Sequence, residues 1–154
     1  HRRCAREEVE NVRRSWNRTW RDHTMAKKVL VVDDEQDMRV YISTLLETNG
    51  FKPLLAEDGR EGLEVARQKR PALIVMDVMM PRESGIQLYR ELKKDPELKD
   101  IPVIMVSALA RKTFFHSQRV LDEYEGGTIP EPADYIEKPP EPDELLAAIR
   151  RILG

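Results

Sequence analysis

Four short runs of residues, far apart in the chain, each end in a reactive side chain. The runs cover 27–32, 72–76, 101–106 and 134–137, and the side chains that follow them are Asp33 with Asp34, Asp77, Ser107 and Lys138. Near-continuous Val- and Ile-rich runs cut off by a polar residue are typical of buried parallel strands. Ligands bind just outside the carboxyl ends of such strands. We therefore expect three carboxylates, a hydroxyl and an ammonium to meet at one edge of one sheet.

Helical patterns follow each of the predicted strands, which lie at 27–32, 51–56, 72–76, 102–107 and 134–137. The helices are expected near 35–49, 60–69, 85–94, 111–124 and 142–153, with an irregular loop over 128–132 and another from Pro81 to Gly85. Strands that alternate with helices predict right-handed βαβ units and a parallel sheet. The fold class is therefore α/β.

Size and composition are those of one globular domain. The 154 residues are 40% hydrophobic and 35% charged, and the formal net charge of -2 gives no general attraction to nucleic acid or to anionic membranes. Cys4 is the only cysteine, so an intramolecular disulfide is excluded and a reducing compartment is favoured. No apolar stretch approaches the roughly 18 residues of a membrane span. We expect a cytoplasmic protein with no direct contact to nucleic acid or membrane.

The composition changes at Met25. Residues 1–24 hold seven arginines against four acids, a net charge of +3, which leaves -5 for 25–154. One interpretation is a basic N-terminal extension or leader ahead of a domain that starts at Met25. The other is a helix, because Val9, Val12, Trp16 and Trp20 recur at helical spacing and would form an apolar stripe that docks on a partner, a second copy or the domain.

The three predicted neighbours Asp33, Asp34 and Asp77 indicate a cation site. Carboxylates gathered at adjacent strand ends repel one another, and a bound cation offsets that repulsion. Ligation by oxygen alone, with few protein ligands, suits Mg²⁺. Acids after strands also cap helices, and Asp33 or Asp34 alone would fit that simpler role. Their combination with Lys138 and Ser107 favours a functional site.

This layout resembles the receiver domain of two-component response regulators over residues 27 to about 153. The pieces that carry the resemblance are Val31-Val32-Asp33-Asp34-Glu35, Met76-Asp77-Val78-Met79-Met80-Pro81, Gly85, Ser107-Ala108 and Tyr135-Ile136-Glu137-Lys138-Pro139. Each piece is short, but their order and their places at strand ends are specific. The resemblance implies a doubly wound, flavodoxin-like sheet of five parallel strands in the order 2-1-3-4-5, with helices on both faces.

The resemblance also implies the chemistry. Asp77 would be the nucleophile that takes a phosphoryl group from a sensor histidine kinase or a phosphotransfer protein. Asp34 and Asp77 would bind Mg²⁺ directly, Asp33 would help through water, and the backbone carbonyl of Met79 would be the third protein ligand. Lys138, which the family usually joins to the next proline by a cis bond, would pair with a phosphoryl oxygen. Such a chain is a phosphoacceptor signalling domain rather than an enzyme with its own substrate.

Ser107 and Tyr135 would form the switch in such a receiver. The Ser107 hydroxyl would bond the phosphoryl group, and Tyr135 would move into the space that the loop after strand four leaves. The surface of strand four, the following helix and strand five would change and bind a downstream protein partner.

The sequence departs from the family pattern in two places. Lys138 lies 31 residues after Ser107, longer than is usual, and the extra length falls in 111–132, which is either a remodelled partner surface or a tolerated loop. Met79 and Leu109 stand where the family often has polar side chains that tune hydrolysis. Since neither side chain can orient water, we expect slow loss of the phosphoryl group.

Other functions fit the sequence less well. A receiver-like interaction scaffold that works without phosphorylation would be expected to lack part of the acidic set, which is complete here. A flavodoxin-like cofactor binder needs a phosphate loop where Asp33, Asp34 and Glu35 stand, and an aspartate-based phosphatase needs a second carboxylate at Met79. We expect a stand-alone receiver, because no second domain follows 142–153; a dimer is compatible with the sequence.

Overall fold

The computed structural model describes residues 2–80 and 85–154, and within helix α1 (Arg2–Met25) it describes the side chains of 5–16 only. The predicted loop from Pro81 to Gly85 lies outside the described residues, except for Gly85, where a helix begins. Among the described residues, no helix is both long and apolar enough to cross a membrane.

Five parallel strands form one sheet, as the sequence predicts. They are β1 (Lys28–Val32), β2 (Lys52–Ala56), β3 (Leu73–Met76), β4 (Val103–Ser107) and β5 (Asp134–Glu137), and they lie in the order β2-β1-β3-β4-β5. Val32 pairs with Met76, so Asp33 and Asp77 leave neighbouring strands at the same level. Ser107 pairs with Glu137, so Lys138 follows beside the end of β4.

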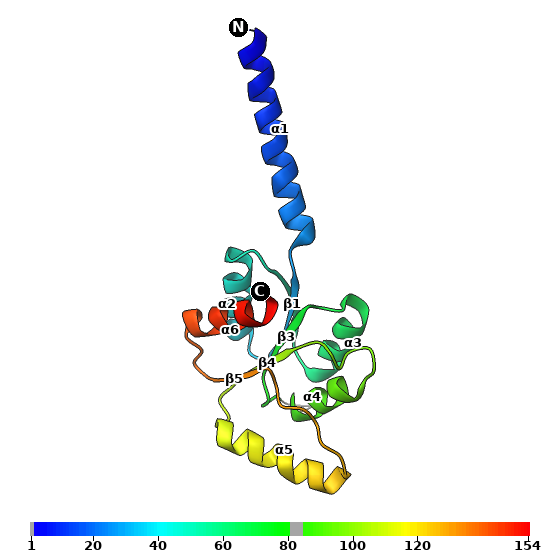
Figure 1. Cartoon of the computed structure of the whole chain (residues 1–154). Helices are drawn as coiled ribbons and strands as arrows, with labels where there is room; N and C mark the ends of the chain where they lie inside the picture. Colours follow the sequence, from blue (N-terminus) through cyan, green and yellow to red (C-terminus); the bar gives the residue numbers. More distant parts are fainter. Residues whose placement is uncertain (1, 81–84) are drawn as a thin grey trace.

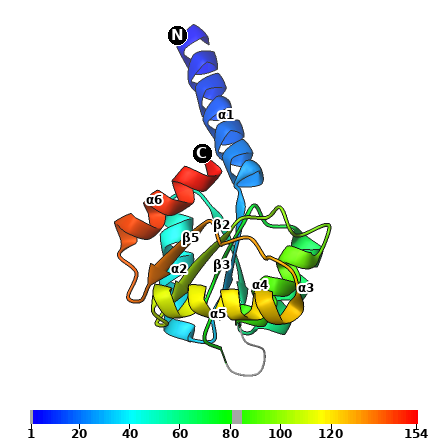
Figure 2. The same cartoon turned by 60° about the horizontal axis from the view of Figure 1, so that its bottom comes forward.

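Helices cover both faces of the sheet (Figure 2). They are α2 (Gln36–Thr48), α3 (Gly59–Lys69), α4 (Gly85–Lys94), α5 (Arg111–Glu125) and α6 (Pro142–Leu153). Alternate strand residues face opposite sides. Val29 and Val31 pack in the core under α2 and α6, whereas Leu30 and Val32 pack in the core under α3, α4 and α5. The doubly wound fold is therefore confirmed.

An additional helix, α1, precedes the first strand and projects away from the sheet (Figure 1). Its Val9, Val12 and Trp16 are exposed, Trp16 to 68%, so these three side chains cover no part of the domain; the side chain of Trp20, the fourth residue of the predicted stripe, lies outside the described residues. The helical interpretation of the segment agrees with the structure. Whether 1–24 is a leader or a docking element stays a prediction.

Gly85 lets helix α4 begin close beneath the loop that carries Asp77. Its backbone N–H donates to the carbonyl of Val78 at 2.9 Å. A Cβ at this position would lie 2.0 Å from the carbonyl oxygen of Asp77, which is backbone and cannot yield as a flexible side chain can. The start of α4 and the position of Asp77 therefore depend on the absence of a side chain at Gly85.

We expect Gly85→Ala to lower the free energy of unfolding by about 2 kcal/mol or more, because the backbone must shift to admit the methyl group. Urea denaturation followed by circular dichroism measures the change. Gly127→Ala is the matched control, since a Cβ there meets nothing within 4 Å. Equal stabilities of the two variants would contradict the steric explanation.

Candidate functional site

Two buried carboxylates lie side by side at the carboxyl ends of β1 and β3. Their backbones are held by the sheet, because the Asp33 N–H donates to Ala56 at 3.1 Å and the Asp77 N–H donates to Val32 at 3.0 Å. The exposed fractions of Asp33 and Asp77 are 2% and 3%. Two negative charges so deeply buried require a neighbouring positive charge.

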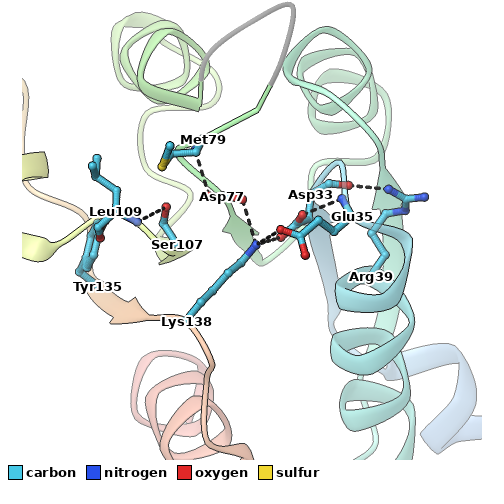
Figure 3. Close-up of polar contacts among 9 residues, drawn as sticks. All are labelled: Asp33, Glu35, Arg39, Asp77, Met79, Ser107, Leu109, Tyr135 and Lys138. Atoms are coloured by element: carbon cyan, nitrogen blue, oxygen red, sulfur yellow. Dashed lines mark hydrogen bonds and ion pairs between the residues drawn. The ribbon is translucent and has the colours of Figure 1, made fainter.

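The ammonium of Lys138 supplies that charge (Figure 3). Its Nζ lies 2.9 Å from Oδ2 of Asp33, 3.0 Å from Oδ2 of Asp77 and 3.2 Å from Oε1 of Glu35. The backbone N–H of Lys138 donates to the carbonyl of Ser107 at 2.8 Å, which ties the lysine to the end of β4. The peptide bond from Lys138 to Pro139 is cis, as expected.

Burial and charge act in opposite directions on these groups. Burial by itself lowers the pKa of Lys138, but its hydrogen bonds to Asp33 and Asp77 outweigh that effect and the pKa is raised. Burial raises the pKa of Asp33 above its ordinary value, although a backbone hydrogen bond from Glu35 and the nearby Lys138 partly counteract it. The lysine is thus held in its charged form, while the charged form of Asp33 is disfavoured by its surroundings.

Four acidic residues together form a candidate cation site. Carboxylate oxygens of Asp33, Asp34, Glu35 and Asp77 all lie within 4.8 Å of one another. Hard oxygen ligands of this kind fit Mg²⁺. Asp33, Asp34 and Asp77 are the members of this group that the sequence predicts as metal ligands, and Glu35 is a further member without a predicted role. The run Asp33-Asp34-Glu35 is the sequence feature that could have indicated Glu35 as a further ligand.

Helix capping does not explain these acids. The N-cap of α2 is Glu35, and its side chain makes no capping hydrogen bond. Oδ1 of Asp33 accepts from the Glu35 backbone N–H at 2.9 Å, which orients the carboxylate before the helix begins. The simpler interpretation of Asp33 and Asp34 as N-caps is therefore wrong.

Met79 contacts the site through its backbone N–H, whereas the sequence-based prediction concerned its backbone carbonyl. Its N–H donates to Oδ1 of Asp77 at 2.9 Å, while its side chain is 57% exposed. Oδ1 of Asp77 therefore faces the Met79 backbone, and Oδ2 faces Lys138. A metal-ligating role for the Met79 carbonyl stays a prediction.

The two predicted switch residues occupy the neighbouring strands. Oγ of the fully buried Ser107 accepts from the Leu109 N–H at 3.2 Å, a contact within the loop that follows β4. The Tyr135 hydroxyl donates to the Leu109 carbonyl at 2.6 Å, and its ring lies 5.1 Å from that of Phe114. Burial raises the pKa of Tyr135, against a smaller opposite effect of its hydrogen bond with Ser107. Both side chains thus form a hydrogen bond with the backbone of Leu109, in the loop after β4.

Arg39 is a supporting residue that the sequence analysis missed. Its Nη1 donates to the backbone carbonyl of Asp33 at 2.7 Å, and its guanidinium lies 3.7 Å from the carboxylate of Glu57. The arginine thus links the loop after β1 to the loop after β2. No sequence motif identifies such a contact, because it depends on how α2 packs on the sheet.

The sequence profile of the response regulator receiver domain matches residues 29–150. The chain belongs to this family, whose members are phosphorylation-dependent signalling domains of two-component systems that work with histidine kinases or phosphotransfer proteins and bind Mg²⁺ at an acidic pocket. The identification made from the sequence is confirmed.

Individual relatives support the assignment. The chain is 34% identical over 127 residues to protein PilH of Pseudomonas aeruginosa. The aligned region covers 82% of this chain and 98% of PilH. It is 37% identical over 129 residues to the phosphate regulon transcriptional regulatory protein PhoB of Escherichia coli, but the match spans only 52% of PhoB. Among solved structures, chemotaxis protein CheY4 of Vibrio cholerae matches with a TM-score of 0.69 and 28% identity, over 83% of this chain and 99% of CheY4.

The raised pKa of Asp33 predicts a pH effect. A carboxyl whose pKa is higher in the folded state stabilises the fold fully below the unfolded value, here 3.8, and loses that contribution as the pH rises through the folded pKa. Asparagine mimics the protonated acid at every pH. In Mg²⁺-free buffer, the free energy of unfolding of Asp33→Asn minus that of the native chain should therefore increase as the pH rises from 3.8 to neutrality.

Urea denaturation at several pH values, with a chelator present, measures this difference. Asp37→Asn is the control, because Asp37 is an exposed carboxylate on the first turn of α2. A difference that stays flat or falls with rising pH would contradict the role given to burial.

Proposed function

We propose that Asp77 is the residue of this receiver domain that accepts a phosphoryl group, from a phosphohistidine on a sensor histidine kinase or a phosphotransfer protein. The observation that carries this assignment is the ammonium of Lys138 at 3.0 Å from Oδ2 of Asp77, beside a group of acids that could hold a cation. Asp77 is the one member of that group whose carboxylate both contacts Lys138 and receives the Met79 N–H.

The transfer needs one new bond and one broken bond. Oδ2 of Asp77 attacks phosphorus, the bond between phosphorus and the donor histidine nitrogen breaks, and the imidazole keeps the electron pair. An aspartyl phosphate results. Because phosphoryl transfer depends mainly on positioning and charge neutralisation, an ammonium held beside the attacking oxygen is the main contribution expected of the protein.

Mg²⁺ is the proposed cofactor of this step. Asp34 and Asp77 would bind it directly, with Asp33 acting through water and the carbonyl of Met79 as a further ligand. The ion supplies positive charge that offsets the phosphoryl oxygens and the acids around them. Lys138 would then pair with a phosphoryl oxygen instead of with two carboxylates. Its ammonium can change partners in this way because the lysine side chain is flexible.

Ser107 and Tyr135 are the proposed switch. A phosphoryl group on Asp77 offers the Ser107 hydroxyl an acceptor, which draws the β4 end and the Leu109 loop toward the site. The Leu109 backbone already joins Ser107 to Tyr135, at 3.2 Å and 2.6 Å, so movement of one residue is expected to move the other. The face formed by β4, α5 and β5 would then change its affinity for a downstream protein. No observation favours a scaffold that works without phosphorylation.

Asp77→Asn should abolish phosphorylation, because an amide oxygen is a far weaker nucleophile than a carboxylate. Incubation of the native chain with acetyl phosphate and Mg²⁺ should add the mass of one phosphoryl group, detected by intact-protein mass spectrometry. The variant should gain no mass, and the exposed control Asp37→Asn should behave like the native chain. Undiminished labelling of Asp77→Asn would place the acceptor elsewhere.

Met79→Asn should accelerate loss of the phosphoryl group severalfold, because an amide near the site can orient the attacking water and the exposed methionine side chain cannot. Decay of the phosphorylated chain after removal of acetyl phosphate measures the rate. Met79→Leu, which keeps the position apolar, should leave the rate unchanged. An unchanged or slower rate for Met79→Asn would count against this explanation.

A further inference from the structure

Helix α1 carries a row of exposed apolar side chains that the receiver function does not use. This α1 seam consists of Ala5, Val9, Val12 and Trp16, which follow one another at intervals of four, three and four residues and therefore lie on one face of the helix. Val9, Val12 and Trp16 are exposed to 63%, 56% and 68%. Large apolar side chains that lie together on a surface favour contact with a partner.

The helix that carries this seam is long and projects into solvent (Figure 1). With 24 residues, α1 is about 36 Å long. All of its described side chains, from 5 to 16, are exposed. Because helices in proteins gain most of their stability from the packing of an apolar face, a second helix laid along the α1 seam would stabilise α1.

The spacing of the α1 seam is that of a two-stranded coiled coil. Such helices repeat every seven residues, written abcdefg, and their a and d side chains pack against the partner helix. Val9 and Trp16 fall at a positions, and Ala5 and Val12 fall at d positions. Because the described seam is short, we expect reversible association that depends on the protein concentration.

The charges beside the α1 seam favour a second copy of this chain, in parallel orientation. Glu8 falls at a g position and Arg13 at the e position of the next heptad. In a parallel pair these two positions face each other across the helices, so Glu8 of each copy meets Arg13 of the other. In an antiparallel pair e positions face e positions, which would set Arg6 and Arg13 against the same arginines of the second copy. Glu10 and Arg14, 3.6 Å apart, pair within one helix on its outer side.

The position of α1 leaves the phosphoryl site open. The helix precedes the amino end of β1, whereas Asp33 and Asp77 follow the carboxyl ends of β1 and β3, at the opposite edge of the sheet (Figure 2). Ala26 and Lys27 belong to neither the helix nor the strand, so the two domains can diverge where the paired helices end. A pair formed through α1 therefore holds two receiver domains together with both acceptor sites accessible.

We propose that α1 pairs with α1 of a second copy of this chain as a parallel two-stranded coiled coil. The α1 seams of the two copies pack against each other, and two Glu8–Arg13 pairs between the copies set the parallel orientation. The association is independent of the chemistry at Asp77 and needs no phosphorylation.

Sedimentation velocity on the full chain, without Mg²⁺ or a phosphoryl donor, tests the pairing. As the concentration rises from micromolar to millimolar, the mass should increase from 17.9 kDa toward twice that value. Val12→Glu puts a charge into the α1 seam and should keep the chain monomeric. Asn11→Glu is the matched control, because it adds the same charge at an exposed position on the outer side of the helix and should leave the pairing unchanged.

Charge exchange tests the partner and the orientation. Glu8→Arg and Arg13→Glu should each weaken the pairing by about tenfold or more, because each sets like charges against one another, and the variant with both changes should pair like the native chain. Circular dichroism shows that each variant is folded. A native chain that stays monomeric would overturn the proposal and leave the α1 seam to a different protein. Undiminished pairing of Val12→Glu or of the single charge variants would also overturn it, as would a double variant that pairs no better than the single ones.

Discussion

The ammonium of Lys138 holds the centre of this molecule together, because it offsets two carboxylates that are almost completely buried. Its Nζ lies within 3.0 Å of both Asp33 and Asp77. Removing one partner of such a group leaves an uncompensated charge in a poorly solvated place, which typically costs about 3–5 kcal/mol. The same arrangement gives the site its chemistry, since an ammonium that balances carboxylates can instead balance a phosphoryl group.

The parallel sheet makes this interaction available. Asp33 follows β1 and Lys138 follows β5, and β3 and β4 lie between these two strands in the sheet. The parallel pairing places all four strand ends at one edge, where the lysine side chain reaches Asp33 and Asp77. Gly85 adds a steric condition, because helix α4 can start under Asp77 only where no Cβ intrudes. The hydrophobic cores on the two faces of the sheet pack against the strands and fix the positions of their ends.

Much of this arrangement was predictable from particular residues. Val- and Ile-rich runs that end in Asp33, Asp77 and Ser107 predicted buried strands and their shared edge, and the observed strands agree within a residue or two. The helix expected over 111–124 is also present, closed at Gly126 in the left-handed conformation. Capping by Asp33 or Asp34 was the simpler alternative, and it is wrong because the chain turns into α2 only at Glu35.

The sequence by itself determined which side chains end the strands, since periodicity and composition are local properties of the chain. It could not show that Glu35 turns toward Lys138, that Arg39 binds the Asp33 carbonyl, or that Arg90 binds Gln118. Those contacts join residues on different elements, and they depend on how helices pack against the sheet. Only the tertiary structure decided them, because a hydrogen bond between distant segments has no fixed sequence spacing.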